Sequence, residues 1–148
     1  MKHTSGQALV EAVVVVGIAV VISVGLLAGA TASLQANRFG KAKTLSVRYA
    51  QEAMEVVRNI RNASWSNFAG HASGTTATKW CMGSLNTLQP YDAVAGCDNY
   101  RVGTNYTRQV TFTWDSVKLI MQVDVLVTWS DGSKTYSTSI STIFTQWR

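Results

Sequence analysis

An uninterrupted apolar run near the N-terminus constrains this chain more than any other feature. Residues 12–36 contain no charged side chain and consist almost entirely of Val, Ile, Leu, Ala and Gly. About 20 such residues cross the roughly 30 Å hydrocarbon core of a membrane as a helix. Glu11 is the one charge at the front of the run, and a lone carboxylate costs roughly 2.5–3.5 kcal/mol at the bilayer centre. We therefore expect a membrane-spanning helix in which Glu11 either has a partner or lies at the level of the lipid headgroups.

After residue 36 the chain becomes polar but keeps a helical spacing. Apolar side chains recur at three- and four-residue steps, at Ala42, Leu45, Tyr49, Ala53, Val56 and Ile60, and the stripe is widened by Ala50, Met54 and Val57. The other face carries Arg48, Gln51, Glu52, Glu55, Arg58 and Asn59. No proline interrupts residues 7–62, so we predict one continuous helix, about 80 Å long at 1.5 Å per residue, whose second half packs by one side.

The middle of the chain, residues 62–108, shows no clear period. It indicates loops, with a short strand or a turn near Thr78–Met82 and a turn at Pro90. We expect Trp65 and Phe68 to pack on the end of the long helix.

The last forty residues predict antiparallel strands. Apolar and polar side chains alternate over 110–114 and along most of 121–129, Ser130-Asp131-Gly132-Ser133 is a turn sequence, and Tyr136, Ile140 and Phe144 lie in a Ser/Thr-rich strand. The expected fold is therefore α+β: a long N-terminal helix with a hydrophobic first half, packed by its C-terminal half against a small antiparallel β-meander head.

Two cysteines, Cys81 and Cys97, lie in the middle segment. They form a disulfide if the head is exported and remain free thiols if it stays in the cytosol. The preceding apolar run favours export and hence the disulfide. A thiol nucleophile would require His71 and an unpaired cysteine, and we do not expect one. With no paired metal-ligand spacing and no phosphate-binding loop, the sequence predicts no enzyme, no metal and no cofactor.

The charge distribution bears on nucleic-acid binding. The net charge is +5, and only Lys2 of the thirteen basic residues precedes the apolar run. A basic head can attract nucleic acid, but these cations are scattered without a block of Lys or Arg. We therefore do not expect nucleic acid to be the main partner.

The N-terminal residues Gly6-Gln7-Ala8-Leu9-Val10-Glu11, followed by the apolar run, resemble the class III leader of type IV pilins and pseudopilins. The resemblance implies cleavage between Gly6 and Gln7 by prepilin peptidase and N-methylation of Gln7. It also gives Glu11 a role in assembly, in which its carboxylate pairs with the new α-amine of a neighbouring subunit and sets register. The helix-plus-sheet head expected here is similar to that of pilins.

The resemblance also implies the division of the chain, its location and its partners. Residues 1–6 would be the leader, 7–36 the transmembrane and filament-core half of the helix, 37–62 its amphipathic half and 63–148 the head. The chain would be a single-pass protein of the cytoplasmic membrane, N-terminus inside, before joining an extracellular pilus or a type II secretion filament. Its partners would be other pilin subunits, prepilin peptidase and the inner-membrane assembly platform.

Two positions depart from the family pattern. Gln7 stands where the family usually has Phe, and the apolar helix lacks the proline of many major pilins. Cleavage in the family depends mainly on the glycine, so processing is still expected. The Gln7 start and the all-strand C-terminus favour a minor pilin.

Other interpretations of the same residues remain open. Ala28-Gly29-Ala30 and Ala30-Thr31-Ala32 both offer a signal-peptidase site, which would make the chain a secreted envelope protein with a small binding head. An uncleaved signal anchor is the related alternative, and a DNA-uptake pilin is another. The cations that follow the run, at Arg38, Lys41 and Lys43, favour the opposite membrane orientation by the positive-inside rule.

Overall fold

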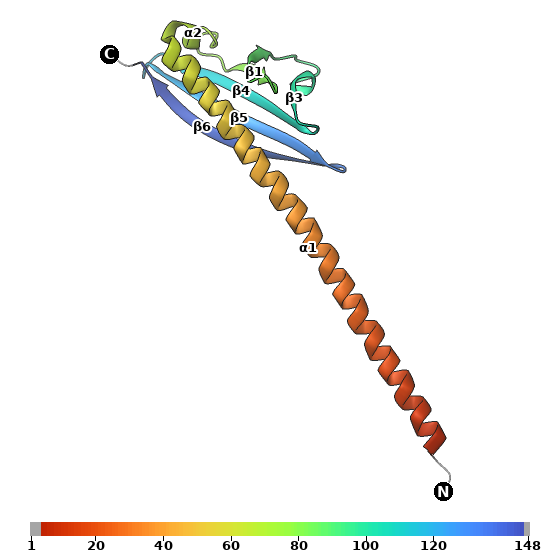
Figure 1. The fold of residues 1–148 in the computed structure, drawn as a ribbon. Helices are drawn as coiled ribbons and strands as arrows, with labels where there is room; N and C mark the ends of the chain where they lie inside the picture. The colour runs from red at the N-terminus through yellow and green to blue at the C-terminus, as the bar shows by residue number, and fades with distance from the viewer. Residues whose placement is uncertain (1–3, 147–148) are drawn as a thin grey trace. The chain divides into compact units, whose positions relative to one another are not determined.

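The computed structural model describes residues 4–146. The elements in chain order are α1 (Thr4–Ala63), α2 (Trp65–Ala69), β1 (Thr78–Met82), β2 (Leu88–Pro90), the 3₁₀ helix η1 (Asp98–Tyr100), β3 (Arg101–Val102), β4 (Tyr106–Asp115), β5 (Ile120–Asp131) and β6 (Lys134–Thr145) (Figure 1). Internal contacts divide the chain after Ala42. From here on, we call the unit from Lys43 onward the head, so the head includes the last part of α1 as well as the residues after it. The predicted α+β fold with a long N-terminal helix is confirmed.

The first unit is the apolar half of α1. Its many Val and Ile residues are branched at Cβ, which lowers helix propensity in water. Inside a membrane no water is present to satisfy the peptide groups, so a single span must bond them internally as a helix. The prediction of one continuous helix is confirmed, because α1 is unbroken from Thr4 to Ala63.

The second half of α1 belongs to the head and packs by one face. The side chains at the centre of this face are Ser46, Ala50, Ala53, Met54 and Val57, and all are buried. The spacing of the predicted stripe is right, but its position is shifted. Three of the buried residues, Ala50, Met54 and Val57, were expected only to widen the stripe. The small side chains of Ala50 and Ala53 allow the sheet to approach the helix closely.

Ser64 ends the long helix and starts the next one. Its backbone is extended, with φ −162° and ψ 115°, and its hydroxyl accepts the backbone N–H of Asn67. This is an N-cap arrangement, which satisfies one of the unpaired donors at the start of α2. The cap turns the chain so that Phe68 enters the core and Trp65 packs beside it, which confirms the predicted position of both aromatic residues.

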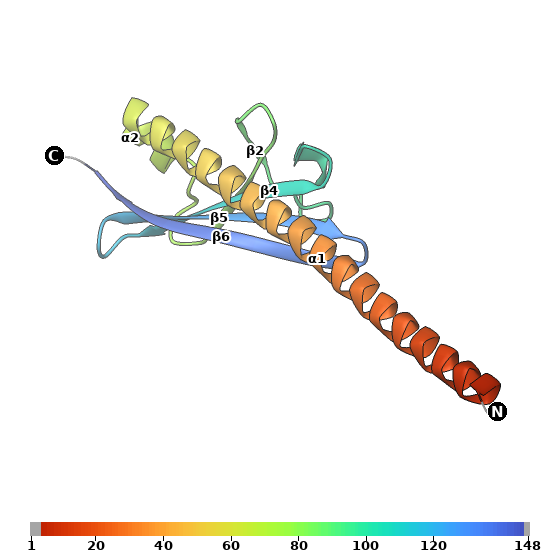
Figure 2. The same ribbon diagram turned by 60° about the horizontal axis from the view of Figure 1, so that its bottom comes forward.

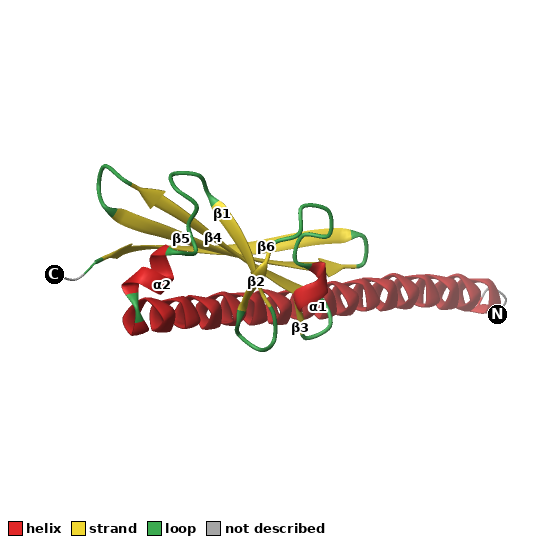
Figure 3. Cartoon of the chain, turned by 90° about the horizontal axis from the view of Figure 1, so that it is seen from above, coloured by secondary structure: helices red, strands yellow, loops and turns green. Residues whose placement is uncertain are grey.

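The sheet forms the second layer of the head, with α1 across one face (Figure 3). Its strand order is β2-β1-β4-β5-β6, with β3 paired to β4, and every pairing is antiparallel. The predicted meander is confirmed in β4, β5 and β6. The β5–β6 turn has two residues, Gly132 and Ser133, because Asp131 pairs with Lys134. Gly132 has φ +61°, a conformation that glycine adopts without steric cost.

Alternation along the strands separates the core from the outer face. In β5 the side chains that face α1 are Met121, Val123, Val125, Val127 and Trp129, and all are buried. They meet Phe68, Phe112 and Phe144, whose rings pack edge to face at 5.3–5.7 Å between centroids. The opposite face of the sheet carries mainly Thr, Ser and Gln side chains.

The middle segment contains more regular structure than the sequence predicted. Of the strand or turn expected near Thr78–Met82, the structure has the strand, and α2, β2, η1 and β3 lie in residues assigned to loops. The turn expected at Pro90 was wrong, since Pro90 is the last residue of β2 and pairs with Trp80. A proline is tolerated there because β2 is an edge strand and needs no donor on its free side.

Candidate assembly surface

The candidate functional site is the apolar surface of the first half of α1. Fourteen Val, Ile and Leu side chains from Leu9 to Leu34 are each 53–72% exposed. Covering one such side chain fully stabilises by about 1.5–3 kcal/mol, so covering the exposed half of all fourteen is worth roughly 10–20 kcal/mol. This rivals the whole stability of a typical domain, about 5–15 kcal/mol. Such a surface requires a cover of lipid or of other apolar helices.

By length and composition, α1 can cross a membrane. The segment that can cross begins at Gly6, near the N-terminus, and the rest of the described chain buries no part of its most apolar stretch. A signal sequence near the N-terminus can meet the same criteria of length and composition. Length and composition therefore do not separate a membrane-spanning helix from a signal sequence. The residues at the N-terminal end of α1 bear on that distinction.

Glu11 lies on this apolar surface and is exposed. It forms no ion pair with any residue that the structure describes. The next charge along α1 is Arg38, 27 residues later and so about 40 Å away along the axis at 1.5 Å per residue. If Glu11 becomes buried among apolar groups, its partner has to come from outside the described part of the chain, because burial of an unpaired charge is costly.

The predicted cleavage site lies in the first turns of α1. Gly6 is exposed and an added Cβ there would meet no atom within 4 Å. Gln7 is also exposed, so the Gly6–Gln7 bond is accessible to an enzyme. The structure brings Gly6, Gln7 and Glu11 together on the first two turns, and the leader residues 1–3 lie outside the described residues.

Sequence reasoning missed one feature of this helix. Gly25 and Gly29 are four residues apart, and nothing lies within 4 Å of a Cβ added at either position. Two glycines at this spacing let helices approach closely in a membrane. Their spacing is visible in the sequence.

The predicted disulfide is present. Cys81 and Cys97 are bonded, with Cα atoms 5.3 Å apart. Cys81 is fully buried and Cys97 is 7% exposed. The bond ties β1 to the loop before η1. With both thiols bonded, neither is available as a nucleophile.

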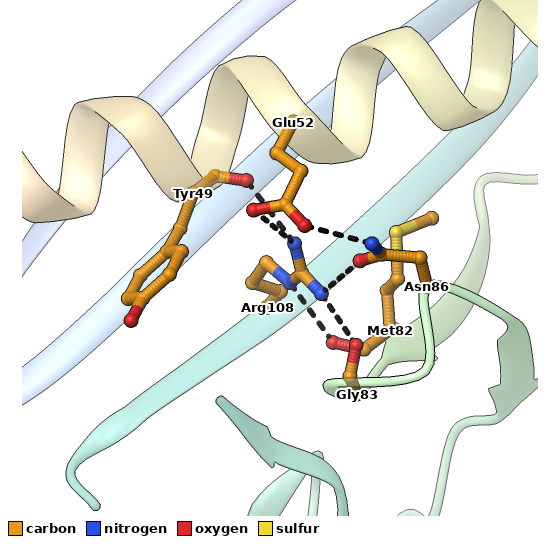
Figure 4. A network of polar contacts seen from close by, with 6 residues as sticks. All are labelled: Tyr49, Glu52, Met82, Gly83, Asn86 and Arg108. Atoms are coloured by element: carbon orange, nitrogen blue, oxygen red, sulfur yellow. Dashed lines mark hydrogen bonds and ion pairs between the residues drawn. The ribbon is translucent and has the colours of Figure 1, made fainter. Parts of the chain in front are cut away.

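A buried arginine joins α1 to the sheet, and no pattern in the sequence predicted its burial. Arg108 in β4 is 0% exposed and lies between α1 and the loop after β1 (Figure 4). Its guanidinium donates to the carbonyls of Met82 at 3.1 Å and of Gly83, and to Asn86 Oδ1 at 2.7 Å. It also donates to the carbonyl of Tyr49 at 3.5 Å.

Glu52 is the charged partner of this arginine. A Glu52 carboxylate oxygen lies 3.7 Å from Arg108 Nη1, and the carboxylate accepts from Asn86 Nδ2 at 2.7 Å. Glu52 was assigned to the polar face of the helix, and it lies at the margin of that face, with a side chain that is 41% exposed. Burial lowers the pKa of Arg108, an effect that the Glu52 charge partly offsets. Since every contact holds helix, loop and strand together, the network is structural.

Two acidic side chains hold loops of the head. Asp92 Oδ1 accepts the N–H groups of Val94 and Ala95 at 2.7 and 2.9 Å. These bonds, that of Ala95 first, lower the pKa of Asp92. Asp115 is held in the same way by the N–H groups of Lys118 and Val117, and its pKa is lowered too.

Other polar residues do not converge on a reactive centre. His71 packs against the rings of Trp80 and Phe112, and Nδ1 lies 2.9 Å from the carbonyl of Asn67. Within residues 4–146, no three His, Cys, Asp or Glu side chains gather to hold a metal. Comparison with protein-family models, curated proteins and solved structures gives no match. The candidate functional site remains the apolar surface of the first half of α1, together with Glu11.

Proposed function

We propose that the chain is a structural subunit, of the minor-pilin kind, of a type IV pilus or a related type II secretion filament. One observation carries the proposal: Glu11, without a described partner, lies on an apolar helix surface that has no cover, five residues after Gly6. A membrane anchor needs the apolar surface alone. A filament core needs, in addition, a charge that selects one register.

Processing would create the partner for Glu11. Prepilin peptidase cuts between Gly6 and Gln7 at the cytoplasmic face and leaves a positive α-amine on Gln7, which is then methylated. In a core made of such helices, the amine of one subunit meets the Glu11 carboxylate of a neighbour. A buried charge left unpaired is strongly destabilising, so neighbours out of register are rejected. Gly25 and Gly29 support close packing of these helices.

The head would be exported while the N-terminus remains inside. The Cys81–Cys97 disulfide supports this orientation, because disulfides persist in oxidising compartments. The cations at Arg38, Lys41 and Lys43 favour the opposite orientation, and our proposal follows the disulfide. From the membrane, the assembly platform would extract the helix into the growing filament.

A signal-anchored or secreted envelope protein is the second candidate, and Ala30-Thr31-Ala32 is the observation in its favour. A DNA-uptake role receives less support. Arg108 is buried, and Arg58, Arg101 and Lys118 each face an acidic side chain.

The experiment that tests the proposal compares two glycine variants in the host cell. Gly6→Val blocks the peptidase, so the chain from membranes keeps its leader and stays out of the sheared filament fraction. Gly17→Val is the matched control, because Gly17 also has open space around an added Cβ. Normal processing of Gly6→Val, or absence of the wild-type chain from sheared filaments, would contradict the proposal.

A further inference from the structure

The two edges of the sheet differ in how they are protected. At one edge β2 has only three residues and ends in Pro90, features that prevent another strand from pairing. At the other edge β6 has twelve residues and pairs with β5 without a bulge from Asp131–Lys134 to Ile120–Thr145. Residues 135–145 contain no charge and no proline. Long, uncharged edge strands of this kind readily accept a further strand.

The hairpin geometry shows which backbone groups of β6 face away from β5. The two-residue turn makes Asp131 and Lys134 the closing hydrogen-bonded pair, and such pairs alternate along an antiparallel ladder. Ser137 and every second residue after it therefore point their N–H and C=O groups to the open edge. The contacts with α1 agree, since the carbonyls of Ser137 and Thr145 accept from Lys43 Nζ at 3.4 Å and Arg61 Nη2 at 2.7 Å.

Three residues between these two contacts form the accessible part of the edge: Ser139, Ser141 and Ile143. All three are exposed. No other strand pairs with this side of β6 among residues 4–146, and β6 lies at the margin of the sheet (Figure 2). We call these three residues and their backbone groups the β6 edge.

Basic side chains stand at both ends of the β6 edge. Lys43 lies at the Ser137 end and Arg61 at the Thr145 end. A groove of about 500 Å³ beside β6 is lined by Arg58, Arg61, Asn62 and residues 142–145. Pairing of β6 with a second copy would place cations against cations in either strand direction. Like charges opposed in this way are destabilising, so the cations exclude self-association and favour an acidic partner.

We propose that the β6 edge binds an extended segment of another protein, a short β-forming strand with carboxylates at its two ends. The backbone of that strand pairs with Ser139, Ser141 and Ile143. Its carboxylates meet Lys43 at one end and Arg61 at the other, since Arg58 is already paired with Glu55. This is binding by strand addition, in which main-chain bonds give affinity and side chains give specificity. The inference holds whether the head is carried on a filament or anchored in a membrane.

The test uses the full chain in detergent micelles and a labelled synthetic peptide, Asp-Asp-Thr-Val-Thr-Val-Thr-Asp-Asp. We expect saturable binding that is at least tenfold tighter than that of the same peptide with Lys in place of Asp. Replacing the central Thr by Pro removes a main-chain donor and abolishes binding. Equal binding of the acidic and basic peptides, or no binding of the acidic one at millimolar concentration, overturns the proposal.

Amide hydrogen exchange on the wild-type chain locates the bound peptide without a mutation. The acidic peptide slows exchange at Ser139, Ser141 and Ile143 by at least tenfold. It leaves Ile140 and Thr142 unchanged, because their N–H groups already face β5. Uniform protection, or protection elsewhere, overturns the assignment to this edge.

Variants then separate backbone pairing from charge. Ser141→Pro removes one outward N–H and loses binding at least tenfold, whereas Ser141→Ala keeps it and changes binding less than twofold. Lys43→Gln weakens binding several-fold and reduces its salt dependence. Lys118→Gln, in the β4–β5 turn, is the matched charge control and changes neither. Equal binding by the proline and alanine variants contradicts strand addition.

Discussion

Replacing Arg108 by Met tests the joint between α1 and the sheet. Methionine is unbranched and fills much of the same space, so the change removes donors more than volume. The carbonyls of Met82 and Gly83 and the Asn86 amide oxygen then lose their donor. A buried acceptor left unpaired costs about 1–3 kcal/mol. Because Gly83 and Asn86 are only partly buried, the three acceptors together give a loss of roughly 3–5 kcal/mol. Glu52 adds little, because its side chain is 41% exposed and water replaces the lost partner.

The assay is chemical unfolding of the full chain with its disulfide intact, in detergent, followed by tryptophan fluorescence. All five tryptophans follow residue 63 in the sequence, so the signal reports on the head alone. In thermal unfolding, the expected loss corresponds to a fall in Tm of about 15 °C or more.

Arg58→Met is the matched control for this change. Among residues 4–146, the ion-pair partner of Arg58 is Glu55 on the helix surface, and the Arg58 side chain is 47% exposed. An exposed pair of this kind contributes about 0.5 kcal/mol. The reasoning fails if Arg108→Met lowers the free energy of unfolding by less than about 1 kcal/mol, or by no more than Arg58→Met does. In that case the network does not hold the sheet on α1.

Three further predictions concern assembly, the disulfide and pH. Glu11→Ala should be processed normally but be depleted from sheared filaments, since its carboxylate acts only between subunits; normal incorporation would reduce it to a headgroup residue. Replacing Cys81 and Cys97 by Ser should lower the free energy of unfolding by about 3 kcal/mol, the loop-closure value for a loop of this size; an unchanged unfolding midpoint would refute this. The lowered pKa of Asp92 means that its charge stabilises the fold above the unfolded pKa, near 3.9, and that this stability is lost as pH falls through the folded pKa. Asp92→Asn should therefore be less stable than wild type at pH 6 but equal to it at pH 2, and a difference that does not change with pH would contradict the cause given.

Regular patterns made most of the fold predictable from the sequence. The long helix follows from an apolar run and a helical stripe without proline, and the meander follows from the alternation over residues 121–129, interrupted only at Leu126, together with a Gly-containing turn. The short strands β2 and β3 were not predicted, because two or three residues show no period. Their pairing is imposed by their neighbours in the sheet.

The residues of the candidate assembly surface were easier to predict from the sequence than the contacts that join α1 to the sheet. Gly6, Gln7 and Glu11 are close in sequence and lie on one helix, so their proximity needs no tertiary information. Arg108 has its partners 22 to 59 residues away, and an arginine within a β-strand ordinarily faces solvent. Its burial depends on carbonyl groups turned toward it by the loop after β1, which no local pattern encodes. The contact of Glu52 with this network was not predicted for the same reason.

The most direct test of the proposed function is the intact mass of the mature chain isolated from membranes. We expect a chain that begins at Gln7, lighter by residues 1–6 and heavier by one methyl group on the new amine. Such a mass would support a pilin-type subunit, because it requires cleavage at the one site from which Glu11 can gain a partner. A chain that begins near Thr31 or Ser33 would contradict the account, since a secreted protein without the apolar helix has no filament core to join.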